Sequence, residues 1–333
     1  MIMKRLYALI AVILVFLGFA FVQEGGDNKT ARVGKPTVGI LQLMSHPALD
    51  AIHHGILHGL KEKGYTPGKD VKIDFQNAQN DQSNLMTMSN RFVNENADAV
   101  IGIATPSAQA LANATSKIPI VLGAVTDPKG AGLVKNNKRP GHNITGVSDQ
   151  APLKEQLGLI KKVMPNMKTL GIFYTSSDDS AVAQYKQFKS LCAQENITLK
   201  AYSISNTNDV DQVSQQMVSG VDAVYVPTDN TVASAMQTLV KNANAAKVPV
   251  FPAVDTMVKS GGLATYSINQ YKLGVITGEM TADILDGKKP ATTPIHYIKH
   301  GDLILNQQEA KKLGITFPAS LVKEAQQKGE IIK

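Results

Sequence analysis

The sequence predicts an α/β protein with two similar lobes, each built around a parallel sheet. After Pro36, short apolar runs alternate with amphipathic stretches, which is the pattern of strands and helices in βαβ units. The apolar runs are continuous, as expected for parallel strands buried on both faces. The same series of elements then occurs a second time along the chain. Together these three observations indicate the fold class.

The first lobe is predicted to start directly after residue 36. Its predicted strands cover residues 37–43, 71–78, 98–104, 118–125 and 143–148. Its predicted helices cover residues 48–64, 83–96 and 107–116. Gly64 is a typical helix end, and Asp81 or Ser83 is the candidate N-cap of the second helix.

The second lobe repeats six of these elements in the same order. The repeated elements cover residues 169–175, 181–197, 198–206, 209–220, 222–230 and 248–254. Equivalent pairs, at offsets of 132, 124 and 130 residues, are Gly39 and Gly171, Asp98 and Asp222, and Pro119 and Pro249. Such a long period indicates a duplication rather than a solenoid.

The C-terminal part is too short for a third domain and is predicted to complete both lobes. It contains two predicted helices, at about 271–286 and 307–313, and segments that cross between the lobes. The expected division is a first lobe of residues 36–148 and about 267–299, and a second lobe of residues 149–266 and about 300–333. Lobes joined by several crossing segments can hinge about a cleft.

Residues 1–35 are predicted to be a signal or anchor segment with a linker. Lys4 and Arg5 precede 17 uncharged residues, 6–22, and polar residues follow, which is the order of a secretory signal. Seventeen residues also just suffice to cross a bilayer, and the preceding basic residues would place the rest of the chain outside. We therefore expect the protein at the extracellular face of the cell membrane, held by residues 6–22 or secreted after cleavage. A buried hydrophobic helix is the alternative.

Composition and missing motifs exclude several function classes. The single cysteine, Cys192, rules out an internal disulfide and is expected in the core; the usual cysteine of a lipoprotein, directly after the apolar segment, is lacking. The net charge of +7 comes from dispersed lysines without the interleaved aromatic residues of a nucleic-acid surface. The chain has no glycine-rich phosphate loop and no G-x-S-x-G elbow. His54 and His58 lie four apart on a predicted helix, opposite its apolar side, so we expect them to face solvent rather than hold a metal.

Small polar residues follow most of the predicted strands, and we expect them to line a ligand cleft. In parallel sheets ligands bind beyond the carboxyl ends of the strands, although each such turn could also be a simple helix cap. The candidate binding residues are Gln42, Ser45, His46, Thr105, Pro106, Ser107, Thr126, Asp127, Tyr174, Ser177, Ser180, Thr228, Asp229, Asn230 and Asp255.

The chemistry of these turns suits an amino acid. Hydroxyls and free N–H groups at the predicted helix start around Ser107 suit a carboxylate, and an aspartate such as Asp229 in a partly desolvated cleft suits an ammonium. Candidate surfaces for stacking are Tyr174, Tyr225, Phe251 and Tyr266, with core packing the stronger expectation for Tyr225. No metal or other cofactor is expected.

Several motifs resemble those of a known transport family. The stretches "GILQLMSHPALDAIHHGILHGLKEKGY", "TPSAQALA", "VTDPKGAGLV", "NITGVSD" and "VPTDNTVASA" closely resemble the substrate-binding family of ABC importers that includes tryptophan- and tyrosine-binding proteins. The resemblance covers about residues 36 to 320. It implies a type I periplasmic-binding-protein fold, with two Rossmann-like lobes, three crossovers and closure on a small ligand contacted by the turns named above.

The resemblance also implies a function. The expected ligand is an aromatic amino acid, tryptophan first and tyrosine or phenylalanine next, and the expected partners are an ABC permease and its ATPase, with the protein a monomer. Other ligands that stay open are a branched-chain amino acid, a sugar or a nucleoside; an enzyme that uses cleft carboxylates is the alternative class. The stretch around Asp255, "FPAVDTMV", departs from the residues expected for the family there.

Overall fold

The computed structural model describes residues 34–333 of the chain. The predicted signal or anchor segment, residues 6–22, lies outside the described residues. Within residues 34–333, no helix combines the length and apolar character that a membrane crossing requires.

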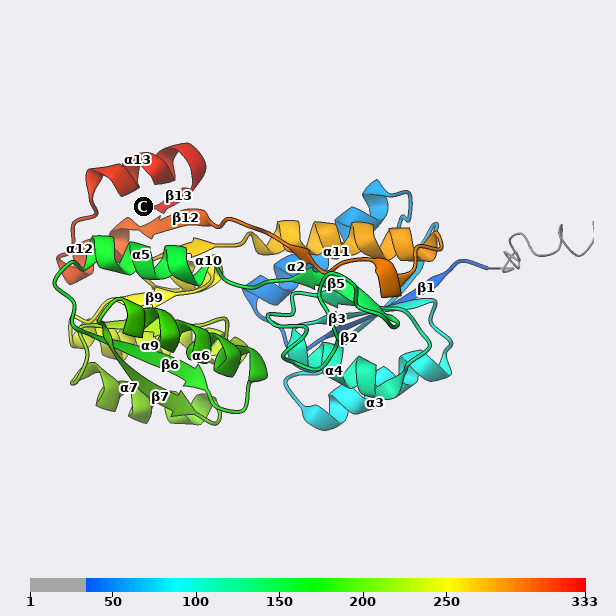
Figure 1. The fold of residues 1–333 in the computed structure, drawn as a ribbon, viewed down its shortest axis with the longest axis horizontal. Coiled ribbons are helices and arrows are strands. Elements are labelled where there is room, and N and C mark those ends of the chain that lie inside the picture. Colours follow the sequence, from blue (N-terminus) through cyan, green and yellow to red (C-terminus); the bar gives the residue numbers. More distant parts are fainter. Residues whose placement is uncertain (1–33) are drawn as a thin grey trace, which may run out of the picture. The chain divides into compact units, whose positions relative to one another are not determined.

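The first sheet has six parallel strands in the order β11-β5-β4-β3-β1-β2 (Figure 1). These strands are β1 (Thr37–Gln42), β2 (Lys72–Asn77), β3 (Ala99–Ile103), β4 (Ile120–Gly123), β5 (Ile144–Ser148) and β11 (His296–Tyr297). One face is covered by α2 (Pro47–Glu62) and α11 (Gln270–Leu285), and the other by α3 (Gln82–Asn94) and α4 (Thr105–Ala114) (Figure 1). Strands β1 to β5 have the spatial order 2-1-3-4-5, which is typical of a doubly wound sheet.

The second sheet repeats this arrangement with four parallel strands in the order β7-β6-β8-β9. The strands are β6 (Thr169–Thr175), β7 (Thr198–Ile204), β8 (Ala223–Val226) and β9 (Val250–Pro252). The helices between and after them are α6 (Asp179–Gln194), α7 (Val210–Val218), α8 (Asn230–Ser234) and α9 (Met236–Ala245).

A third, small sheet completes the second lobe, and the sequence did not predict it. Its strands are β10 (Ala264–Ser267), β12 (Asp302–Asn306) and β13 (Glu330–Ile332). Because β10 and β12 are antiparallel, the expectation of parallel sheets is wrong here. The helices around it are α5 (Leu153–Val163), α10 (Asp255–Lys259), α12 (Gln307–Leu313) and α13 (Ala319–Lys328).

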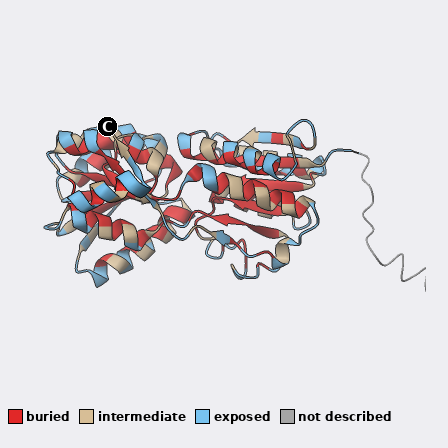
Figure 2. Cartoon of the chain, turned by 90° about the horizontal axis from the view of Figure 1, so that it is seen from above, coloured by how far each residue is buried: buried red, intermediate tan, exposed pale blue. Residues whose placement is uncertain are grey.

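The chain crosses between the two groups of sheets three times. The crossings lie at residues 149–152 between β5 and α5, at 268–269 between β10 and α11, and at 298–301 between β11 and β12. Each group encloses its own cluster of buried apolar side chains, which fill the sheets and the inner helix faces (Figure 2). The predicted fold class, two α/β lobes joined by three crossovers, is confirmed.

The internal repeat has the same hydrogen bonds in both lobes. Asp98 precedes β3, and its carboxylate accepts a hydrogen bond from the Thr37 N–H at 2.8 Å. Asp222 precedes β8 and accepts the equivalent bond from the Thr169 N–H, also at 2.8 Å. The repeated Asp-Ala-Val motif thus fixes the start of the third strand of each lobe against the first.

Candidate ligand-binding site

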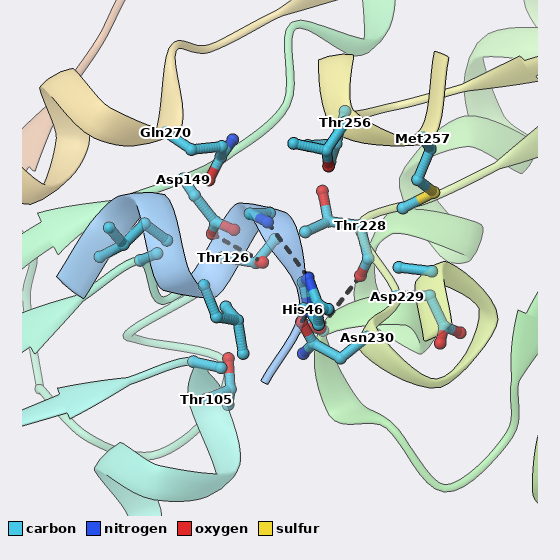
Figure 3. Close-up of a pocket in the computed structure, with 18 residues that line it drawn as sticks. His46, Thr105, Thr126, Asp149, Thr228, Asp229, Asn230, Thr256, Met257 and Gln270 are labelled. Atoms are coloured by element: carbon cyan, nitrogen blue, oxygen red, sulfur yellow. Dashed lines mark hydrogen bonds between the residues drawn. The ribbon is translucent and has the colours of Figure 1, made fainter. Parts of the chain in front are cut away.

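One cavity lies where the two doubly wound sheets face each other. In such sheets ligands bind beside the point where the strand order reverses, which is between β1 and β3 in one lobe and between β6 and β8 in the other. The loops that follow all four strands line the cavity, through His46, Thr105, Ser180 and Asp229 among others (Figure 3). The empty space among its lining atoms is about 440 Å³, and this figure includes open solvent at the mouth.

His46 connects the two sides of the cavity. It is the N-cap of α2, and its Nδ1 accepts a hydrogen bond from the Ala48 N–H at 3.3 Å. Its Nε2 therefore carries the hydrogen and donates to Asn230 Oδ1 of the other lobe at 2.9 Å (Figure 3). Burial lowers the pKa of His46, so the ring is neutral and bridges the lobes without charge.

The start of α4 contributes polar groups that have no partner within residues 34–333. Thr105 Oγ1 and Ser107 Oγ are both buried and make no hydrogen bond there. Ala104, directly before them, has a left-handed backbone with φ of 75°, a strained conformation of the kind found at binding sites. Thr105 lines the cavity, and the helix N-terminus beside it favours an anionic group.

The aspartates near the cavity differ in how their oxygens are used. Asp229 caps α8: it accepts from the Val232 N–H, the Thr175 N–H and the Thr175 hydroxyl at 2.9, 2.6 and 2.9 Å. Burial is the main reason that its pKa rises to about 6. All of these bonds lie within its own lobe, and Asp229 also lines the cavity; that it receives an ammonium stays a prediction.

Asp149 lines the cavity, and the sequence reasoning missed it. It follows β5 at the first crossing and is buried, and its Oδ1 accepts the Thr126 hydroxyl at 2.9 Å (Figure 3). Burial raises the pKa of Asp149 to about 6. The sequence signal was present, because Asp149 follows a predicted strand as Asp127 and Asp229 do.

The structure brings seven of the fifteen predicted residues into this cavity. These are His46, Thr105, Thr126, Ser180, Thr228, Asp229 and Asn230. The other eight lie outside its lining: Gln42, Ser45, Pro106, Ser107, Asp127, Tyr174, Ser177 and Asp255.

The physical reason is that several of these residues serve their own turns. Gln42 and Ser45 both donate to Asp50 in the first turn of α2. Asp127 accepts from the Gly130 N–H at 2.8 Å. Asp255 faces Lys259 one turn along α10, at 3.6 Å.

The predicted aromatic surfaces also lie elsewhere. Tyr174 stacks on Tyr185 with ring centroids 5.0 Å apart. Tyr225 stacks on Phe188 in the core, as expected for it. The hydroxyl of Tyr266 donates to Glu324 at 2.8 Å, and Phe251 is buried. None of the four candidates lines the cavity.

The apolar wall of the cavity is aliphatic instead. Its side chains come from both lobes and include Leu49, Ile52, Val254 and Met257. Aliphatic groups and a methionine sulfur make favourable contacts with aromatic rings. Leu49 and Ile52 belong to the predicted helix at residues 48–64, but nothing local indicates that their side of it borders a cavity.

Comparisons with known proteins give a consistent result. Residues 37–328 match the family model described as ABC transporter substrate binding protein. A tyrosine-binding protein of Clostridioides difficile (strain R20291) is 37% identical over 287 residues, which is 86% of this chain and 83% of that protein.

Two solved structures are also similar. A Streptococcus pneumoniae domain in complex with L-Trp is 44% identical, with a TM-score of 0.87 over 90% of this chain and 100% of that one. The ligand-free, open structure of a Clostridium difficile substrate-binding protein with adhesive properties is 37% identical. Its TM-score is 0.71 over 90% of this chain and 99% of that one. With two sheets around one cavity and a family match across nearly all of the described residues, this chain belongs to the ABC transporter substrate-binding proteins.

Proposed function

We propose that this protein captures an aromatic amino acid between its lobes and delivers it to an ABC permease and its ATPase. Tryptophan is the first ligand expected, and tyrosine or phenylalanine the next. Proteins of this family work outside the cytoplasm, and their role is transport rather than catalysis. Residues 6–22 are proposed to hold the protein at the extracellular face or to direct its secretion, and the working form is proposed to be a monomer.

The observation that carries the proposal is the two-sided character of the cavity. One part is polar, with the Asp149 carboxylate and the unpartnered Thr105 hydroxyl. Another part is apolar, with Leu49, Ile52 and Met257. An amino acid with a large apolar side chain needs both kinds of surface, and the cavity lining contains no lysine or arginine that would favour a phosphate.

The arrangement of the lobes also supports capture by closure. This chain superposes better on the L-Trp complex, with a TM-score of 0.87, than on the ligand-free, open structure, with a TM-score of 0.71. The His46–Asn230 hydrogen bond spans the two lobes directly. Both observations fit a closed arrangement in which a bound ligand is enclosed.

The test is a thermal-shift screen of the protein against all amino acids, followed by calorimetry. At a hundredfold excess over its Kd, tryptophan should raise the free energy of unfolding by about 2.7 kcal/mol. The ligand should be recovered intact, since transport makes and breaks no bond. A shift with leucine, a sugar or a nucleoside but none with tryptophan, tyrosine or phenylalanine would refute the ligand assignment.

A further inference from the structure

Two buried aspartates, Asp149 and Asp229, line the cavity, and the half-buried Asp178 lies two residues before the lining residue Ser180. The oxygens of Asp229 and Asp178 already accept hydrogen bonds from their own lobe. Asp229 is bonded to the backbone and hydroxyl groups of its own lobe. Asp178 accepts from the Ser180 N–H at 2.8 Å and from the Ala181 N–H at 3.2 Å at the start of α6. These carboxylates are N-caps, and their oxygens hold the helices in place.

Asp149 differs from both because it caps no helix. Its partners are the Thr126 hydroxyl at 2.9 Å and its own backbone N–H. Helix α5 begins only at Leu153, with Pro152 as its N-cap. Asp149 as a whole residue is 7% exposed, and its carboxylate lies beside Thr126 on the cavity wall (Figure 3).

No cation of the described residues compensates this carboxylate. The cavity lining contains no lysine or arginine, and no ion pair is formed by Asp149. His46 is the titratable group of α2 that lines the same cavity, but it is neutral and its Nε2 hydrogen is directed to Asn230. A buried carboxylate without a positive partner is costly, and a ligand that brings a positive charge removes that cost.

We infer that Asp149 receives the α-ammonium group of the amino acid bound in the cavity. This inference rests on the proposed function and names the residue that distinguishes an amino acid from a ligand without an amine. The ammonium would form a charge-assisted hydrogen bond with Asp149, with the Thr126 hydroxyl holding the carboxylate in place. The unpartnered Thr105 hydroxyl at the start of α4 remains available to the ligand's carboxylate.

The experiment combines a protein variant with a ligand analogue. Asp149→Asn keeps the shape of the side chain and removes its charge. Indole-3-propionate keeps the ring and carboxylate of tryptophan and lacks the amine. Calorimetry or competition would measure both ligands on the wild type, on Asp149→Asn and on Asp255→Asn. The last variant is the matched control, because Asp255 is a nearby acid that does not line the cavity.

The expected result is a selective loss. Asp149→Asn should weaken tryptophan binding by about tenfold to a hundredfold, the usual range for a hydrogen bond to a charged group. Indole-3-propionate should bind this variant no more weakly than it binds the wild type. Asp255→Asn should bind tryptophan within about twofold of the wild type.

Two outcomes would overturn the inference. Tryptophan affinity unchanged in Asp149→Asn would do so, as would an equal loss for tryptophan and the analogue, which indicates a change of cavity shape. If the analogue binds too weakly to be measured, the test is the difference in tryptophan affinity between Asp149→Asn and Asp255→Asn. Failure of tryptophan, tyrosine and phenylalanine to bind the wild type contradicts the proposed function instead.

Discussion

At the residue scale, aspartates of the same sequence context have different roles. Asp127, Asp149 and Asp229 each follow a strand at the same edge of a sheet, within one to four residues of its end. Asp127 and Asp229 accept backbone N–H groups of the next turn, whereas Asp149 lines the cavity with a hydroxyl partner. The role of each aspartate depends on whether backbone N–H groups of the following turn lie within reach of its carboxylate, and the tertiary structure determines this.

Replacing Asp229 with alanine is expected to destabilise the fold. The change removes the acceptor of the buried Thr175 and Val232 N–H groups, which should cost about 1–3 kcal/mol of unfolding free energy. Urea denaturation measures this cost. Asp302→Ala, at an exposed position in β12, is the control and should stay within about 0.5 kcal/mol of the wild type. Equal stability of the two variants would contradict the capping role.

Tryptophan binding is expected to weaken in acid. Burial raises the pKa of free Asp149 to about 6, whereas the ligand's ammonium favours the ionised form, so binding releases a proton below that pH. The Kd should be constant above about pH 7 and rise about tenfold between pH 7 and pH 5.

Other titratable groups face Asp149 and need separate control. Asp178, at the start of α6, is the charged neighbour that helps raise its pKa, and Asp229 also has a pKa of about 6. The carboxylates of Asp178 and Asp229 accept hydrogen bonds from their own lobe, and burial lowers the pKa of His46. The Kd of Asp149→Asn should therefore be flat with pH; a tenfold slope in that variant would assign the proton to another group.

At the element scale, α2 and α11 pack with their backbones in contact. A Cβ on Gly274 would lie 2.0 Å from the Ile52 carbonyl oxygen, and one on Gly59 would lie 2.0 Å from the Val275 carbonyl oxygen. Ile52 and His46 both belong to the cavity lining. The close helix pair therefore fixes the position of the α2 residues that meet the ligand.

The substitution Gly274→Ala is expected to force these helices apart. Overpacking of this kind costs about 1–3 kcal/mol and should lower the melting temperature. Gly158→Ala in α5 is the matched control, because a Cβ there meets nothing within 4 Å and alanine favours a helix by up to about 1 kcal/mol. A melting temperature of Gly274→Ala equal to that of Gly158→Ala would contradict the close packing.

Strong local patterns made most elements of the two doubly wound sheets predictable. The structure places β6 at 169–175 and α12 at 307–313, as the sequence indicated. Helices α5 and α9 were missed: α5 lies beside a lobe boundary, and α9 follows the short α8 after the single residue Ala235. Strands β10 and β12 pair across about 40 residues, so no local pattern marks them as partners.

At the scale of the whole molecule, a second hydrogen bond joins the lobes at the rim. Gln109 of α4 donates to Asp179 at the start of α6, at 3.0 Å. Asp179 lines a groove beside the ligand cavity, and neither residue of the pair lines the cavity itself. It stabilises the closed arrangement without touching a ligand there.

Loss of this bond should weaken binding through the lobe equilibrium. Asp179→Ala is expected to raise the Kd for tryptophan about threefold to tenfold, mainly by faster dissociation, because an exposed bond of this kind contributes about 0.5–1.5 kcal/mol. Stopped-flow fluorescence cannot use a protein tryptophan, since the chain has none, so the ligand's own fluorescence reports release. An unchanged dissociation rate would show that the rim pair does not hold the lobes closed.

A crystal structure of the protein with tryptophan would show directly which side chains hold the ligand. We expect the indole ring between Leu49, Ile52 and Met257 and the ammonium within hydrogen-bond distance of Asp149. We also expect Asp229 to keep its bonds to Thr175 and Val232. Tryptophan bound outside this cavity, or bound within it with its ammonium on Asp229 or Asp255, would refute the assignment of the ammonium to Asp149.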